Sequence, residues 1–250
     1  MIKNSEWLQS LPFGLAVKMA ALYLVRKLTR IPVSFSYAQG AEDIIIPYLA
    51  KYHLGIEGPG NYVDVGCNAP IRYSNTFHLY LTGWRGLNID ANGELIRECR
   101  KIRRQDVCVQ AAVSDAEREV TFHKAKDDAV STIDETRLVE WKEHFEFDDN
   151  DQETVVTRTL TSILDEHWKH GDAIDVLSID VEGHDFQVLK SLDLSKYRPK
   201  IIVIEMHSIE NLERTDIYQY LIANGFAFKF YAVLNVYFAD SQVLLDEKAE

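Results

Sequence analysis

Acidic and histidine side chains gather at the ends of two apolar core strands, which we predict over 175–180 and 200–207. The group consists of Asp180, Glu182, His184, Asp185, Glu205 and His207. Neighbouring strands of a parallel sheet end at the same edge, so we expect these side chains to lie close together. Clustered carboxylates raise one another's pKa, which lets one of them remove a proton near neutral pH.

Two kinds of chemistry suit this acidic group. In the first, a general base activates a weak nucleophile such as an alcohol, with His207 and Glu182 as the leading candidates. In the second, Asp180 and Glu205 hold a divalent cation such as Mg²⁺, which lowers the pKa of the bound hydroxyl. A structural interpretation stays open beside them, in which Glu182 and His184 cap the following helix.

A second group of residues follows two earlier strands. Asp64 lies near the end of a strand predicted over 61–66, and Gly66 after it lets the backbone come close to a ligand. Asp90 ends the strand 86–90, where a carboxylate can accept hydrogen bonds from both hydroxyls of a ribose. The spacing is not GxGxxG, so the sequence does not favour a dinucleotide cradle.

The elements that must position these residues alternate between strands and helices. Further strands are predicted over 107–113, 119–124 and 154–160, with a final pair within 226–240. Helices are predicted over 41–52, 75–81, 93–104, 161–169, 184–192 and 214–224. This alternation predicts an α/β fold with a doubly wound, mostly parallel sheet. The final pair has no room for a connecting helix, so we expect the last strand to run antiparallel.

The composition sets limits on the class of protein. A chain of 250 residues with 46% hydrophobic residues can bury a core, and a net charge of −12 argues against a nucleic-acid partner. Three cysteines without a CxxC motif argue against a disulfide framework and fit a reducing compartment. We expect an N-terminal segment (1–35), a domain over 36–250, and within it an acidic surface insertion over 125–153.

The N-terminal segment is apolar and basic. Residues 1–35 hold five Lys or Arg side chains and one Glu, and the apolar run over 13–25 is interrupted by Lys18. This run is too short to span a membrane. Two interpretations stay open: a helix lying at the interface of an anionic membrane, or a helix packed on the domain or on a second subunit of a homodimer. We expect a cytoplasmic protein, peripheral to the inner face of the membrane under the first interpretation.

Six segments of the chain resemble the FkbM family of class I methyltransferases, which use S-adenosyl-L-methionine (SAM). The segments are YAQGAED (37–43), VDVGCNAPIRYSNT (63–76), GWRGLNIDAN (83–92), AAVSD (111–115), LSIDVEGHDFQVLKSLD (177–193) and YRPKIIVIEMH (197–207). The resemblance covers about residues 36–240 and implies a Rossmann-like sheet of seven strands. One departure is Ala69-Pro70, where a second glycine is commoner in class I enzymes.

The resemblance implies a cofactor role for individual residues. The implied SAM-binding set is Gln39, Glu42, Asp64, Gly66, Asn68, Ser74, Asn75, Asp90, Ala112 and Asp180. Within it, Asp64, Gly66 and Asn68 would line the methionine end of SAM, and Asp90 would hold the ribose. The segment 106–114 would flank the adenine. Gln39 and Glu42 would fold over the cofactor or begin a helix.

The resemblance also implies methyl transfer to an oxygen atom. Our first expectation for the acceptor is a sugar hydroxyl of a bacterial glycan or glycolipid, and the alternative is a hydroxyl of a secondary metabolite. The insertion over 125–153 and the N-terminal helix are expected to shape the acceptor pocket. Two other classes stay open: an NAD-dependent oxidoreductase, which the missing third glycine of the GxGxxG motif and the antiparallel last strand disfavour, and a non-catalytic SAM-fold binding module.

Overall fold

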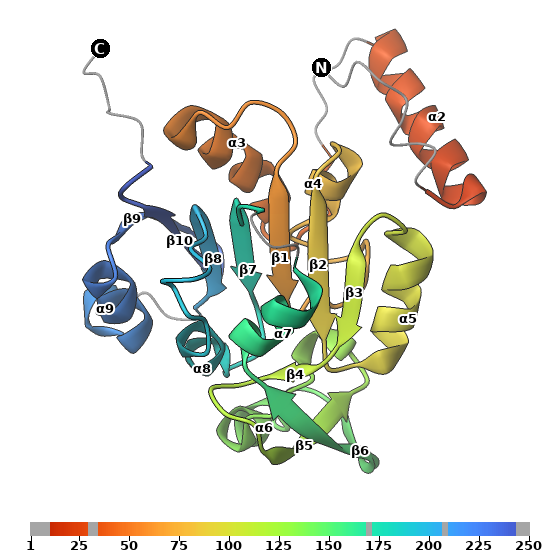
Figure 1. The fold of residues 1–250 in the computed structure, drawn as a ribbon. Helices are drawn as coiled ribbons and strands as arrows, with labels where there is room; N and C mark the ends of the chain where they lie inside the picture. Colours follow the sequence, from red (N-terminus) through yellow and green to blue (C-terminus); the bar gives the residue numbers. More distant parts are fainter. Residues whose placement is uncertain (1–10, 30–34, 169–171, 207–209, 244–250) are drawn as a thin grey trace.

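The central sheet of the computed structural model has seven strands in the order β3-β2-β1-β7-β8-β10-β9 (Figure 1). The structure describes residues 11–29, 35–168, 172–206 and 210–243. The strands are β1 (Asn61–Val65), β2 (Arg85–Asp90), β3 (Val107–Gln110), β7 (Val176–Ile179), β8 (Ile201–Glu205), β9 (Phe226–Ala232) and β10 (Asn235–Asp240). β10 runs antiparallel to both of its neighbours, and the other pairings are parallel. The predicted fold class is confirmed, including the antiparallel final strand.

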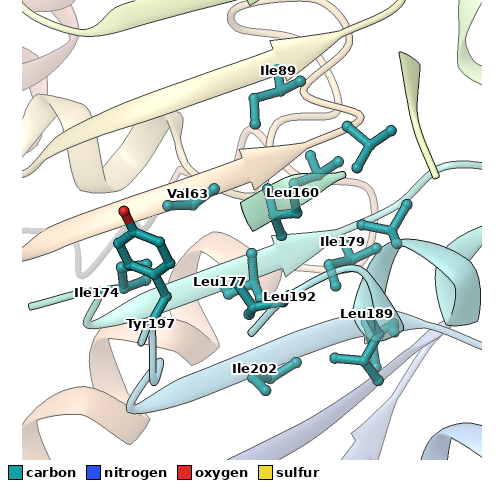
Figure 2. Packing of buried hydrophobic residues seen from close by; sticks show 14 of the residues in the cluster. Val63, Ile89, Leu160, Ile174, Leu177, Ile179, Leu189, Leu192, Tyr197 and Ile202 are labelled. Carbon is teal, nitrogen blue, oxygen red and sulfur yellow. The ribbon is translucent and has the colours of Figure 1, made fainter. Parts of the chain in front are cut away.

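Helices cover both faces of this sheet. On one face lie α3 (Glu42–Leu54), α4 (Phe77–Leu81) and α5 (Gly93–Ile102), and on the other lie α7 (Leu160–His167), α8 (Asp185–Lys190) and α9 (Asp216–Ala223). Successive side chains of a strand point to opposite faces. Val63 therefore packs in one cluster with Leu160 of α7 and Ile179 of β7, as Figure 2 shows. Tyr62, one residue earlier, packs on the opposite face with Leu49 of α3.

A second, smaller sheet corrects two expectations. It consists of β4 (Ala112–Val113), β5 (Glu119–Ala125) and β6 (Phe147–Arg158), with α6 (Glu135–Trp141) and the short 3₁₀ helix η1 (Asp128–Val130) between β5 and β6. The strand predicted over 107–113 is interrupted at Ala111, and its two parts join different sheets. The acidic insertion over 125–153 is not only a surface loop, because it contains α6 and because its last part, from Phe147, pairs antiparallel with β5. This backbone pairing outweighs the polar composition from which a loop was predicted.

The chain order creates a crevice at the carboxyl ends of β1 and β7. From β1 the chain proceeds outward to β2 and β3, and it then returns to β7 on the other side of β1. In open α/β sheets, ligands bind at such a reversal of strand order, outside the carboxyl ends of the strands. Gly66, directly after β1, and Asp180, directly after β7, meet at this crevice.

A fully buried arginine supports the crevice from below. Arg103 has no exposed surface and makes six hydrogen bonds with groups of β1, of β2 and of the loop between β1 and α4. The acceptors are the Pro70 carbonyl, Tyr62 Oη, Ser74 Oγ, Thr76 Oγ1 and Asn88 Oδ1. The carboxylate of Asp106 accepts from Tyr62 Oη at 2.5 Å and from Asn88 Nδ2 at 3.2 Å. Arg103 therefore ties the loop 66–76 to the sheet.

Replacing Arg103 should destabilise the protein strongly. We expect Arg103→Met to lower the free energy of unfolding by about 3–5 kcal/mol, because the substitution leaves buried acceptors and carboxylates without their cation. Urea-induced unfolding measures this. The matched control is Arg104→Met, since Arg104 is exposed; its effect should be below about 0.5 kcal/mol. Equal effects of the two substitutions would contradict the structural role of Arg103.

Candidate active site

An open cavity of about 580 Å³, a volume that includes the solvent at its mouth, lies at the crevice. Its walls come from the ends of β1, β2 and β7 and from the second sheet. The lining residues are Val65, Gly66, Asn68, Asp90, Ala91, Asn92, Ala111, Ala112, Val113, Phe122, Ser131, Thr132, Ile133, Asp180 and Val181. A cavity with this mixed lining suits a small organic molecule that carries both apolar and polar parts.

Gly66 brings the ends of β1 and β7 into contact. Its φ is +79°, and a Cβ at this position would lie 1.7 Å from the backbone oxygen of Asp180. The backbone N–H groups of Gly66 and Cys67 both donate to the Ile89 carbonyl, at 2.9 and 3.1 Å. Only glycine satisfies both the backbone conformation and the close approach. The wall of the cavity at this point is therefore bare backbone.

The carboxylate of Asp90 is held in a fixed orientation at the cavity. Its Oδ2 accepts from the backbone N–H of Asn68 at 2.9 Å, and its Oδ1 accepts from that of Asn92 at 2.8 Å. Asn68 takes a left-handed conformation with φ 48°, which asparagine adopts more readily than most residues. The Asp90 carboxylate also lines the cavity, so it is placed to accept hydrogen bonds from hydroxyl groups of a ligand.

Three carboxylates meet beside the cavity. Oxygen atoms of Asp180, Glu182 and Glu205 all lie within 4.8 Å of one another. Burial, followed by the charge of Glu182, raises the pKa of Glu205 to about 9. Burial, followed by the charge of Asp180, raises the pKa of Glu182 to about 9. Burial and the charge of Glu205 also raise the pKa of Asp180. The group therefore retains protons at neutral pH and can exchange them with a ligand.

The segment 125–153 supplies a cation that acts on two of these acids. Arg137 of α6 lowers the pKa of both Glu182 and Glu205, although burial outweighs this effect. Its side chain lies against Gly183, where an added Cβ would be 3.1 Å from Arg137 Nε. Thr132 Oγ1 donates to the Glu182 carbonyl at 2.9 Å. These contacts fix the loop after β7, in which Glu182 has a left-handed backbone with φ 53°.

The structure brings one part of the predicted set together. Gly66, Asn68, Asp90, Ala112 and Asp180 line the cavity. Glu182 and Glu205 join them through the acidic group. The strand-end positions from which these residues were predicted account for their convergence, since the carboxyl ends of parallel strands share one edge.

Other predicted cofactor residues lie away from the cavity wall. Asp64 is buried and accepts from Thr76 Oγ1, and Ser74 accepts from Arg103. Asn75 donates to Ser178 Oγ at 3.2 Å. These three side chains belong to the hydrogen-bonded layer beneath the cavity, because they face the sheet rather than the crevice. They support the loop 66–76 through these hydrogen bonds, and their predicted contact with SAM stays a prediction.

The remaining predicted residues have separate positions. Glu42 begins α3, where it accepts from the Gly40 N–H at 2.7 Å and from Asn235 Nδ2 at 3.1 Å; its charge reaches Asp180. Gln39 is exposed and does not line the cavity.

The two histidines predicted at the acidic group are His184 and His207, and the structure does not show either of them there. His184 Nε2 lies 2.8 Å from Ser114 Oγ, and His184 Nδ1 lies 3.9 Å from Asp134 Oδ2. The histidine occupies the N-cap position of α8, but its side chain makes no capping hydrogen bond. Its ring therefore faces Ser114 rather than the three carboxylates, contrary to the predicted catalytic position. His207 lies outside the described residues.

Several residues of the site have no signal in the sequence. Phe122 of β5, the segment 131–133 and Arg137 reach the site only through the second sheet. They lie about 45 to 60 residues before Asp180 and Gly183 in the chain. The segment 131–133 and Arg137 belong to the region 125–153, whose composition is that of a surface loop, whereas Phe122 belongs to the strand predicted over 119–124. The sequence indicated the segment 131–133 and Arg137 only as parts of an insertion that was expected to shape the acceptor pocket.

Comparisons with known proteins place the chain in a family. A family model described as "Methyltransferase FkbM domain" matches residues 64–228, which is more than half of the chain, and this match confirms the resemblance. No curated protein sequence matches the chain.

Among solved structures, the chain is similar to methyltransferase FkbM from Methylobacillus flagellatus KT, with 12% identity and a TM-score of 0.45. That alignment covers 72% of this chain and 43% of the other, so this chain spans less than half the length of that protein. It is also similar to precorrin-6y C5,15-methyltransferase from Geobacter metallireducens GS-15, with 10% identity, a TM-score of 0.43, and coverage of 84% and 92%.

Removing a buried acid from the site should stabilise the protein. The folded state raises the pKa of Glu205 from 4.5 to about 9, so its stabilising contribution is complete below pH 4.5 and is lost as the pH rises toward about 9. We expect Glu205→Gln to raise the free energy of unfolding by about 1–3 kcal/mol above neutral pH and to change it little in acid. Urea unfolding across this pH range measures the difference.

The matched control is Glu98→Gln, because Glu98 is exposed on α5. This substitution should leave the free energy of unfolding nearly unchanged at every pH. A Glu205→Gln variant that is less stable than the parent at high pH would show that Glu205 is ionised and well paired in the folded protein.

Proposed function

Because the chain belongs to the FkbM methyltransferase family, we propose that it transfers a methyl group from SAM to a hydroxyl oxygen of a sugar in a bacterial glycan or glycolipid. The observation that supports an oxygen atom as the methyl acceptor is the group of three carboxylates beside the cavity. An alcohol is a poor nucleophile at neutral pH, so its methylation needs a group that accepts the hydroxyl proton.

The lining of the cavity fits SAM. Asp90 lines the cavity with its carboxylate held by two backbone N–H groups, and a carboxylate in this place can accept hydrogen bonds from the two ribose hydroxyls. Ala112 and Phe122 offer apolar surface for the adenine. The bare backbone at Gly66 leaves room for the methionine portion, and the Asp180 carboxylate can pair with its ammonium group. When bound there, SAM supplies an electrophilic methyl group on a positively charged sulfur.

We assign the proton acceptor to Glu182. Side-chain hydrogen bonds favour the ionised forms of both Glu205 and Glu182, from Asp180 in the first case and from Trp141 in the second. Glu182 has Arg137 beside it, and this cation favours the ionised form that a base requires. The contact between Thr132 and the Glu182 carbonyl fixes the backbone that carries the carboxylate. Glu182 then takes the acceptor's hydroxyl proton, while Asp180 and Glu205 orient the hydroxyl group.

The charge of the site favours a neutral, hydroxyl-rich acceptor. Carboxyl groups exchange hydrogen bonds with sugar hydroxyls in either protonation state, and each ionised member of the group repels a phosphate or carboxylate on a substrate. A neutral sugar residue meets this requirement with several hydroxyls at once. A hydroxyl group of a secondary metabolite meets it with fewer and remains our second choice.

The two other classes of protein, an NAD-dependent oxidoreductase and a non-catalytic SAM-fold binding module, receive no support. Membership of a methyltransferase family excludes the NAD-dependent oxidoreductase. A non-catalytic binding module has no use for three acids whose pKa values are raised, since such groups cost stability.

Substitution of Asp90 should weaken SAM binding. Asp90→Ala removes two charge-assisted hydrogen bonds to the ribose, so we expect a loss of about 2–4 kcal/mol in the binding free energy. Isothermal titration with SAM measures the affinity. The control is Asp172→Ala, an exposed aspartate away from the cavity, which should bind SAM as the parent does. Unchanged affinity in Asp90→Ala would remove this residue from the cofactor site.

The base and metal mechanisms make opposite predictions for chelation. With Glu182 as base, EDTA should not change turnover, and Glu182→Gln should lower it by about 10²–10⁴-fold. The rate should rise with pH toward about 9 in the parent and lose that rise in the variant. Methyl transfer is followed through formation of S-adenosylhomocysteine with a panel of sugars.

A divalent cation would give the reverse pattern. Carboxylate oxygens this close together are hard ligands of the kind that Mg²⁺ prefers. In that case EDTA should abolish turnover, Mg²⁺ or Mn²⁺ should restore it, and Asp180→Ala and Glu205→Ala should be the most damaging substitutions. Near-normal turnover in the Asp180, Glu182 and Glu205 variants at saturating SAM would place the chemistry elsewhere.

A further inference from the structure

The N-terminal helix α2 (Phe13–Thr29) is attached to the protein by one side of its first half. Leu15, Ala16 and Met19 pack against a cluster that includes Phe77 and Tyr80 of α4. From Ala21 to the end of the helix every residue is exposed. Figure 1 shows α2 at the edge of the molecule, at the opposite end from the second sheet. Most of the helix surface is therefore open to a partner.

The open side of α2 is an apolar stripe. Phe13, Val17, Leu24 and Leu28 recur at spacings of four, seven and four residues, which places them on one face of a helix. Their exposed fractions are 85%, 52%, 53% and 72%. This stripe lies opposite Leu15 and Met19, so packing on α4 cannot bury it. A helix with two apolar sides needs a second apolar environment.

Positive charges border this stripe. At 100° per residue, Lys18 and Lys27 fall on its two sides, and α2 contains no acidic residue. The whole chain, in contrast, has a net charge of −12. Two copies of α2 would repel each other, because each carries Lys18, Arg26 and Lys27 without a carboxylate. A surface that is negatively charged outside and apolar beneath complements both the stripe and its border.

We propose that α2 binds the surface of a membrane containing anionic lipids, with its axis in the membrane plane. The four apolar side chains enter the boundary between headgroups and acyl chains, while Lys18 and Lys27 extend to the lipid phosphates. Among the described residues, no helix is long and apolar enough to cross a membrane, and α2 is about 26 Å long at 1.5 Å per residue. This binding is independent of the proposed methyl transfer.

The test uses the full chain and sedimentation with lipid vesicles. The protein should sediment with vesicles that contain phosphatidylglycerol, should bind much less to phosphatidylcholine alone, and should be released by salt. Leu24→Glu should abolish sedimentation, because it puts a carboxylate into the apolar stripe. Lys18→Gln should weaken binding about fivefold, since one cation near an anionic surface contributes that much.

The matched control is Tyr52→Glu, which introduces the same charge at an exposed apolar position of α3. It should sediment as the parent does, and circular dichroism should show all variants folded. Equal binding to both kinds of vesicle, or sedimentation that survives Leu24→Glu, would overturn the proposal. So would light scattering that shows a dimer converted to monomer by Leu24→Glu, because the stripe would then bind a second copy.

Discussion

The buried guanidinium group of Arg103 is the constraint on which the rest of the site depends. It has no contact with solvent, and six hydrogen bonds join it to β1, to β2 and to the loop that carries Pro70, Ser74 and Thr76. A buried cation is tolerated only when its hydrogen bonds and countercharges are complete. Because the loop must supply several of these partners, its path is fixed, and with it the backbone that leaves Gly66 and forms one wall of the cavity.

The acidic group beside the cavity is a second set of buried charges, and in this set the carboxyl groups outnumber the cation. Asp180, Glu182 and Glu205 lie together with Arg137 as the cation that offsets them, and burial raises the pKa of each acid. The protein thus gives up stability at this point, as active sites commonly do. The second sheet limits this cost, because it brings Arg137 and Thr132 against the loop after β7 and fixes that loop without neutralising the acids.

The layer around Arg103 and the cavity above it also explain why similar carboxylates have different roles. Asp64 and Asp90 both lie near the carboxyl ends of neighbouring strands, yet Asp64 faces the layer around Arg103 and Asp90 lines the cavity. The difference arises from position along the strand. Asp64 precedes the end of β1 and accepts from Thr76 at the N-cap of α4. Asp90 is the last residue of β2 and accepts from the backbone of the crossing loop.

The α/β fold, the antiparallel final strand and the positions of Gly66, Asp90 and Asp180 at the cavity could be predicted from the amino-acid sequence. These features follow from local periodicity and from the rule that parallel strands end at one edge, both of which can be read without knowing the packing. The support of the site by Asp64, Ser74 and Asn75, the contact of His184 with Ser114 and the place of Arg137 beside the acids become visible only in the folded structure. Each of these contacts joins residues far apart in the chain, and which side chains meet across such a separation depends on how the sheets and helices pack, not on local sequence.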